Sequence, residues 1–108
     1  AAAAVCARAI VESRARQPDI RHVCLFAQAI NRIDATGVDT FAKLRAQLGV
    51  RGITLHLSGV KLPVETALRR AGALEAGPWL VEYRTDAEAL AALSRLAVLP
   101  DDIAAAAI

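Results

Sequence analysis

The sequence predicts an α/β fold in which a small, mostly parallel sheet alternates with helices. Three short apolar segments, 21–27, 53–58 and 79–83, have the length and composition of strands. Apolar residues recur at helical spacing between these segments, and glycine or proline stands at the boundaries. Strands that alternate with helices form a parallel sheet through right-handed crossovers. The 108 residues suffice for a single domain, 1–108, with one modest core.

The first half of the chain contains two predicted helices, one before and one after the first strand in the sequence. Residues 1–16 form the first helix, which ends at Gln17-Pro18-Asp19 because proline cannot continue helical hydrogen bonding. Strand 21–27 is apolar enough to be buried on both faces, and a loop over 28–34 leads to a second helix over 37–49. The apolar residues at near-helical spacing in this helix are Val38, Phe41, Leu44 and Leu48.

The second half contains two further predicted helices. Strand 53–58 alternates apolar with polar residues, so one of its faces is expected to be less dry than the other. Pro63 suits the first turn of a third helix that Gly72 ends, and Thr85 with Glu88 forms a capping box for the last helix, which Pro100 ends. The residues expected to face the core are Val64, Ala67, Leu68 and Ala71 in the third helix and Leu90, Leu93 and Leu96 in the last.

A sheet of only three strands is thin and leaves an edge exposed. We therefore expect a strand or hairpin before Ala1 in the natural protein, or an edge that another chain or a tail covers. The alanine runs 1–4 and 104–107 add little burial and support no prediction.

Composition and motifs exclude several classes of function. The net charge is only +2, the arginines are spread along the chain and aromatic residues make up 4%, so no nucleic acid partner is expected. Cys6 and Cys24 show no CxxC spacing, which argues against a metal site or a redox pair. No cofactor is expected. No run of about 18 apolar residues predicts a membrane span.

Catalytic groups are also missing from the sequence pattern. The serines lack a G-x-S-x-G setting, so no nucleophile elbow is expected. His22 and His56 have no acid, nucleophile or second histidine at a usable spacing, and both are interpreted as ordinary strand residues. The chain is therefore not expected to be an enzyme.

One candidate site stands where the loop after the first strand meets the second helix. Asp34, Thr36 and Gly37 place a carboxylate, a hydroxyl and a glycine at the start of this helix. The first backbone N–H groups of a helix have no partner within it and favour anions. The position suits a phosphate or an anionic group of a partner, although Thr36 can equally serve as a simple helix cap.

With these elements placed, residues 20–93 resemble a STAS domain, the module shared by sulfate transporters and anti-sigma-factor antagonists. The resemblance to the transporter branch is carried by four segments: Arg21 to Leu25, Ala29 to Gly37, Arg51 to Leu57 and Gly59 to Lys61. It implies a non-enzymatic domain at the cytoplasmic face of the inner membrane, on the C-terminal side of a bacterial anion transporter of the sulfate or bicarbonate class. Its partners are then the transmembrane domain, a second subunit or a cytoplasmic regulatory protein. The family fold normally opens with strands before the first helix, so Ala1 is expected to fall within or near that helix, with the opening strands before it.

The resemblance leaves two further functions open. In the antagonist branch, the hydroxyl residue before the glycine accepts a phosphate from a kinase, and Thr36 takes that position here. Phe26 stands where family members usually carry an aspartate, and Gln28 where a serine is common, which puts a kinase-dependent switch in doubt. A nucleotide-binding module is the third reading, and the missing GxxxxGK[ST] motif weighs against it.

The candidate surface extends from the loop into the second helix. Arg32, Lys43 and Lys61 are expected to form a basic rim around the Thr36 loop. The candidate residues for binding an anion or a partner are Asn31, Arg32, Asp34, Thr36, Gly37, Asp39, Thr40, Lys43 and Lys61, with Thr36 as the candidate phosphoacceptor.

Overall fold

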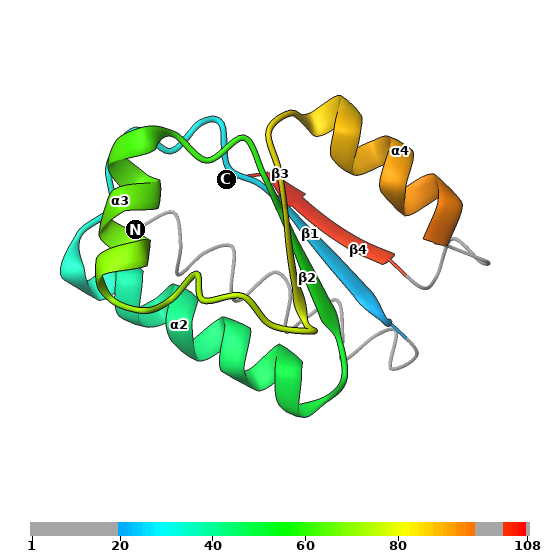
Figure 1. Cartoon of the computed structure of the whole chain (residues 1–108), viewed down its shortest axis with the longest axis horizontal. Helices are drawn as coiled ribbons and strands as arrows, with labels where there is room; N and C mark the ends of the chain where they lie inside the picture. Colours follow the sequence, from blue (N-terminus) through cyan, green and yellow to red (C-terminus); the bar gives the residue numbers. More distant parts are fainter. Residues whose placement is uncertain (1–19, 97–102, 108) are drawn as a thin grey trace.

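The computed structural model of the chain describes residues 20–96 and 103–107, which form a sheet with helices on both sides (Figure 1). The elements in chain order are β1 (His22–Phe26), α2 (Ala35–Val50), β2 (Thr54–Ser58), α3 (Leu62–Arg70), β3 (Leu80–Tyr83), α4 (Asp86–Leu96) and β4 (Ile103–Ala107). The strands lie in the order β3-β2-β1-β4, and every pair is parallel. The predicted helix over 1–16 lies outside the described residues.

The predicted α/β fold class is confirmed, and β4 is the element that the sequence did not predict. The three predicted strands form in parallel, each one residue shorter at its start than predicted, and the first also one residue shorter at its end. The alanine segment pairs with β1, with His22 opposite Ile103 and Phe26 opposite Ala107. Alanine has a low strand propensity, so this pairing depends on the neighbouring strand and not on a local signal. Of the coverings we expected, a tail from the same chain occupies the β1 edge.

One face of the sheet packs against α2 and α3 and is apolar. Val23 and Leu25 of β1 and Leu55 and Leu57 of β2 are almost completely buried in this core. Helix α2 contributes Phe41, Leu44 and Leu48, and α3 contributes Val64 and Leu68. In α3, Ala67 is only half-buried and Ala71 is exposed, so its buried stripe is narrower than predicted.

The other face of the sheet packs against α4. Ala89 and Leu93 of α4 contact Cys24, and Phe26 and Tyr83 pack around them. Leu90 was predicted to face the core, but its side chain is 54% exposed. Leu93 is buried as predicted, and Ala89, four residues before it on the same helix face, takes the buried position in place of Leu90. Nothing is described of the Leu96 side chain or of Pro100.

Local signals at the helix ends are largely confirmed. Pro63 stands in the first turn of α3, and Gly72 follows the helix with a φ of 72° that favours glycine. At the start of α4, the Glu88 N–H donates to Thr85 Oγ1 at 3.2 Å, as a capping box requires. The Glu88 carboxylate accepts from the Arg84 N–H instead of the Thr85 N–H, so the box is displaced by one residue on that side.

Candidate functional site

The start of α2 is capped by Asp34. Asp34 has extended backbone angles, and its Oδ1 accepts a hydrogen bond from the Gly37 N–H at 2.7 Å. A carboxylate suits this position because it accepts from a free N–H and carries the charge that the helix dipole favours. The helix therefore begins at Ala35, two residues before the predicted start at Gly37. Thr36 as the cap is wrong, because it is the second residue of the helix.

Thr36 presents its side chain to solvent in this first turn. Its carbonyl accepts a hydrogen bond from Thr40 Oγ1 at 2.9 Å. Among the described residues, no hydrogen bond involves the Thr36 hydroxyl itself. An exposed hydroxyl at a helix N-terminus is accessible to a modifying enzyme, and a phosphate there would meet the positive end of the helix dipole.

Gly37 is required by the close approach of the preceding loop. The residue is buried, and a Cβ added to it would stand 2.8 Å from Ile33 Cγ1 and 3.2 Å from Asp34 Oδ1. Its φ is not positive, so space and not an unusual dihedral excludes a side chain. The glycine thereby lets Ile33 fold back under the helix start and hold Asp34 in its capping position.

The loop before α2 is tied to the loop between β2 and α3. Lys61 Nζ donates to Asn31 Oδ1 at 2.5 Å. Gln28 packs against Gly59, whose φ is 69° and whose added Cβ would overlap the Gln28 side chain. Both loops follow the carboxyl ends of neighbouring parallel strands, the place where open α/β sheets present their binding sites.

The basic side chains of the candidate surface make separate interactions. Lys43 pairs with Asp39 at 2.9 Å across one helical turn, and both side chains are exposed. Lys61 bonds Asn31, and Arg32 is exposed in the loop. The structure thus brings Asp34, Thr36, Gly37 and Thr40 together in the first two turns of α2 and its cap, with Asn31 beside Lys61. The basic rim of Arg32, Lys43 and Lys61 around the Thr36 loop stays a prediction.

Sequence reasoning missed a chain of aromatic polar contacts on the α4 side of the sheet. His22 Nδ1 lies 3.1 Å from His56 Nε2, and His56 Nδ1 lies 2.9 Å from the Tyr83 hydroxyl. The His56 and Tyr83 rings are stacked with their centroids 5.8 Å apart. Burial, together with the neighbouring His22, lowers the pKa of His56 to about 4. His56 is therefore neutral at pH 7, donating at one ring nitrogen and accepting at the other.

This polar face is also dry, which corrects the prediction for strand 53–58. His56 and Ser58 are both completely buried. Ser58 Oγ donates to Asp86 Oδ1 at 2.6 Å, which ties β2 to the first turn of α4. In the described part of the chain, every buried side-chain nitrogen and oxygen has a partner. The alternation of apolar and polar residues in the sequence predicted which face of the strand is polar. Only the register of the strands shows that the polar groups on this face find hydrogen-bond partners within the protein.

Groups for metal or nucleophile chemistry do not converge in the described residues. No cluster of three or more His, Cys, Asp or Glu suited to a metal occurs there. The Cys24 thiol is buried, and this burial, with Asp86 nearby, raises its pKa to about 11, so the thiol stays protonated. Across residues 20–96 and 103–107, no helix is long and apolar enough to cross a membrane.

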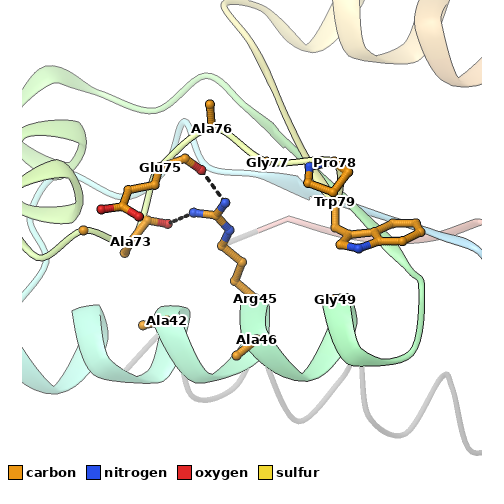
Figure 2. A pocket seen from close by; sticks show the side chains of 11 residues that line it. Ala42, Arg45, Ala46, Gly49, Ala73, Glu75, Ala76, Gly77, Pro78 and Trp79 are labelled. Carbon is orange, nitrogen blue, oxygen red and sulfur yellow. Dashed lines mark hydrogen bonds between the residues drawn. The ribbon is translucent and has the colours of Figure 1, made fainter.

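A shallow groove of about 330 Å³ lies between α2 and the segment before β3 (Figure 2). Arg45 reaches across it and donates to the carbonyls of Ala73, at 2.8 Å, and of Glu75. The Trp79 ring packs against Gly49 at the end of the groove. Because the guanidinium is already engaged by two carbonyls, its role here is to hold this segment against α2.

These features define a small α/β domain with two joined loops at one end of a parallel sheet. The chain belongs to the STAS domain family, whose sequence profile matches residues 1–87. STAS domains are generally non-enzymatic domains with a regulatory role in protein interaction. No curated protein and no solved structure matched the chain.

Proposed function

We propose that this STAS domain regulates a bacterial membrane anion transporter of the sulfate or bicarbonate class through protein contacts. The contact surface is the α2 entry surface, which we define by its candidate residues: Asn31, Arg32, Asp34, Thr36, Gly37, Asp39, Thr40, Lys43 and Lys61. The partner is the transmembrane domain of the same transporter or a second subunit, at the cytoplasmic face of the inner membrane. A cytoplasmic regulatory protein is the alternative partner.

The observation that carries the proposal is the combination of a rigid loop with exposed polar side chains. Asp34 and Gly37 fix the loop from below, and the Lys61–Asn31 bond ties it to the next loop. Thr36 and Asp39 are exposed on this fixed frame. A surface that is ordered before binding loses less conformational freedom on association.

A second candidate function is that of a stand-alone anti-sigma-factor antagonist switched by phosphorylation at Thr36. The exposed, unengaged hydroxyl of Thr36 favours it, because a kinase can reach it without opening the helix. Phe26, in place of the usual aspartate, weighs against it, since the phosphoacceptor then lacks that carboxylate nearby.

The test measures binding of the domain to the membrane region encoded by the same gene, by titration calorimetry in detergent. Thr36→Glu should lower the affinity at least about tenfold, because it places a negative charge in the contact surface. Its matched control is Ser94→Glu, which makes the same kind of change at an exposed hydroxyl on α4 and should leave affinity unchanged.

Two outcomes separate the candidates, and melting curves check that the variants fold. Equal binding by Thr36→Glu and the wild-type domain would exclude the α2 entry surface. A parent gene without membrane spans, together with kinase-dependent phosphate on Thr36, would replace the transporter reading with the antagonist reading. Melting curves of both variants should match that of the wild type, since a glutamate in the first turn of α2 meets a favourable dipole.

A further inference from the structure

The outer edge of β3 is open in the described part of the chain. β3 is the last strand on its side of the sheet. The carbonyls of Trp79 and Tyr83 accept from Leu55 and Gly59 and so point toward β2. Because successive backbone groups of a strand alternate in direction, the N–H and C=O of Glu82 point away from the sheet. Such groups are a template for pairing with another strand.

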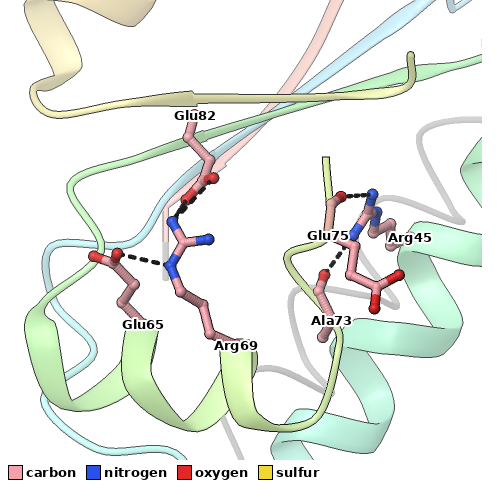
Figure 3. A network of polar contacts seen from close by, with 6 residues as sticks. All are labelled: Arg45, Glu65, Arg69, Ala73, Glu75 and Glu82. Carbon is pink, nitrogen blue, oxygen red and sulfur yellow. Dashed lines mark hydrogen bonds and ion pairs between the residues drawn. The ribbon is translucent and has the colours of Figure 1, made fainter. Parts of the chain in front are cut away.

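The side chains beside this edge carry charges of both signs. Arg69 donates to Glu65 at 2.9 Å and to both carboxylate oxygens of Glu82 at 3.2 and 3.3 Å (Figure 3). This cluster contains two carboxylates and one guanidinium, so it has an excess negative charge. Arg84 is the first residue after β3, and Glu82 and Arg84 both line a hollow of about 400 Å³ between β3 and α3.

We propose that β3 pairs antiparallel with β3 of a second copy of this chain, with the two-fold axis at Tyr83. Glu82 and Arg84 stand on either side of Tyr83, so this axis places Glu82 opposite the partner's Arg84, and the reverse. Opposite charges on directly opposed residues of an antiparallel pair attract each other. Here Arg84 of each copy lies opposite the negatively charged cluster of Glu65, Arg69 and Glu82 in the other copy. The edge is thus complementary to itself, as a two-fold interface requires.

The backbone contributes to the same pairing. The Glu82 N–H faces the partner's Arg84 carbonyl, and symmetry repeats this bond. The Arg84 N–H already donates to Glu88, so it adds no further bond unless Glu88 moves. An interface built on a four-residue strand is small, and small interfaces give weak, concentration-dependent association.

Sedimentation equilibrium of the 108-residue chain tests the pairing. The average mass should rise from 11.4 kDa toward twice that value between roughly 10 µM and 1 mM, and less so at high salt. Arg84→Glu or Glu82→Arg alone should weaken association at least about tenfold, whereas the two changes together should restore it to within about threefold. Arg51→Glu, which reverses an exposed charge at the end of α2, is the matched control and should have no effect.

Uncharged glutamine substitutions keep the test usable if a charge reversal disturbs the fold. If either reversal changes the circular dichroism spectrum, Arg84→Gln and Glu82→Gln replace the pair, and each should weaken association by about threefold or more. A mass that stays at the monomer value at every concentration overturns the proposal. So does association that ignores both residues, or that the double reversal fails to restore. An edge that serves a peptide of another protein would also leave the isolated chain monomeric.

Discussion

The two faces of the sheet are closed in different ways by the same strands. The face toward α2 and α3 is filled by leucine, isoleucine, valine and phenylalanine side chains and contains no buried polar side chain among those described. The face toward α4 has a small apolar patch around Cys24, beside His56 and Ser58, whose polar atoms bond Tyr83 and Asp86. Both faces contain completely buried residues, so burial alone does not distinguish them. They differ in whether apolar contacts or hydrogen bonds replace the contacts with water.

This difference predicts separate responses to mutation and to pH. Hydrophobic contacts do not depend on protonation, and their loss creates a cavity. A hydrogen-bonded face instead responds to the charge state of its members and to the loss of single bonds. The changes below are ordered from the largest expected effect on the free energy of unfolding to the smallest.

Leu55→Ala should have the largest effect. Leu55 of β2 is completely buried in the apolar core between the sheet and the helices α2 and α3. Its truncation therefore removes apolar contacts and leaves a cavity. The free energy of unfolding should fall by about 2–5 kcal/mol, and by the same amount at pH 7 and pH 5. Urea denaturation at both pH values measures it. A loss at pH 5 that differs clearly from the loss at pH 7 would mean that the two faces are coupled.

Acid should weaken the α4 face through His56. The folded protein holds the pKa of His56 at about 4, below its ordinary value of 6.5, so the unfolded chain binds the proton first. The stability that neutral His56 gives the folded protein is fully present above pH 6.5 and is lost as pH falls toward 4. Through this group the free energy of unfolding falls by at most about 3 kcal/mol. Urea midpoints between pH 7 and pH 4 measure it.

The His56→Gln variant is the control for the acid response. Glutamine does not titrate, so this variant should lose less stability than the wild type between pH 6.5 and pH 4. It should also be less stable than the wild type at pH 7, since it lacks the stacked ring beside Tyr83. Identical pH profiles for the two proteins would show that other groups cause the acid response.

Ser58→Ala should cost about 1 kcal/mol by removing the bond to Asp86. The effect is small because Asp86 is only half-buried and water can replace the lost donor. Hydrogen exchange should accelerate in α4 and remain unchanged in α2, because this bond joins only α4 to the sheet. Uniform acceleration in both helices would argue that the two faces unfold together.

Asp34→Ala and Thr36→Val give the smallest effects and separate the cap from its neighbour. The first should cost about 1 kcal/mol, since it leaves the Gly37 N–H without its acceptor. The second should change stability by less than about 0.5 kcal/mol, because the Thr36 side chain is exposed. Thermal melts of the two variants compare them, and the reverse order would return the capping role to Thr36.

The elements that the sequence predicted are those with strong local signals. The strand 53–58 has alternation, α3 has a proline and a glycine at its ends, and the α4 start has its Thr85–Glu88 pair. Asp34 and Thr36 are both good capping residues, so sequence alone left their roles open. The backbone angles at Asp34 decide between them.

The features that escaped prediction depend on contacts between distant segments. His22, His56 and Tyr83 come from three different strands, and only the register of those strands brings them together. Ala89 and Leu90 are both apolar and both good helix formers, so the pattern did not fix the exact orientation of α4. β4 has no strand signal of its own, and its position follows from the backbone groups that β1 offers.

The order of strands also governs when the sheet can be completed. β1 comes first among the described strands and lies between β2 and β4, the last of them. Pairings between segments far apart in a chain form slowly, because the chain must lose the entropy of closing a long loop before the paired segments make any stabilising contact. A nascent chain can therefore assemble β1, β2 and β3 first, and the pairing on the other side of β1 can form only after β4 has emerged.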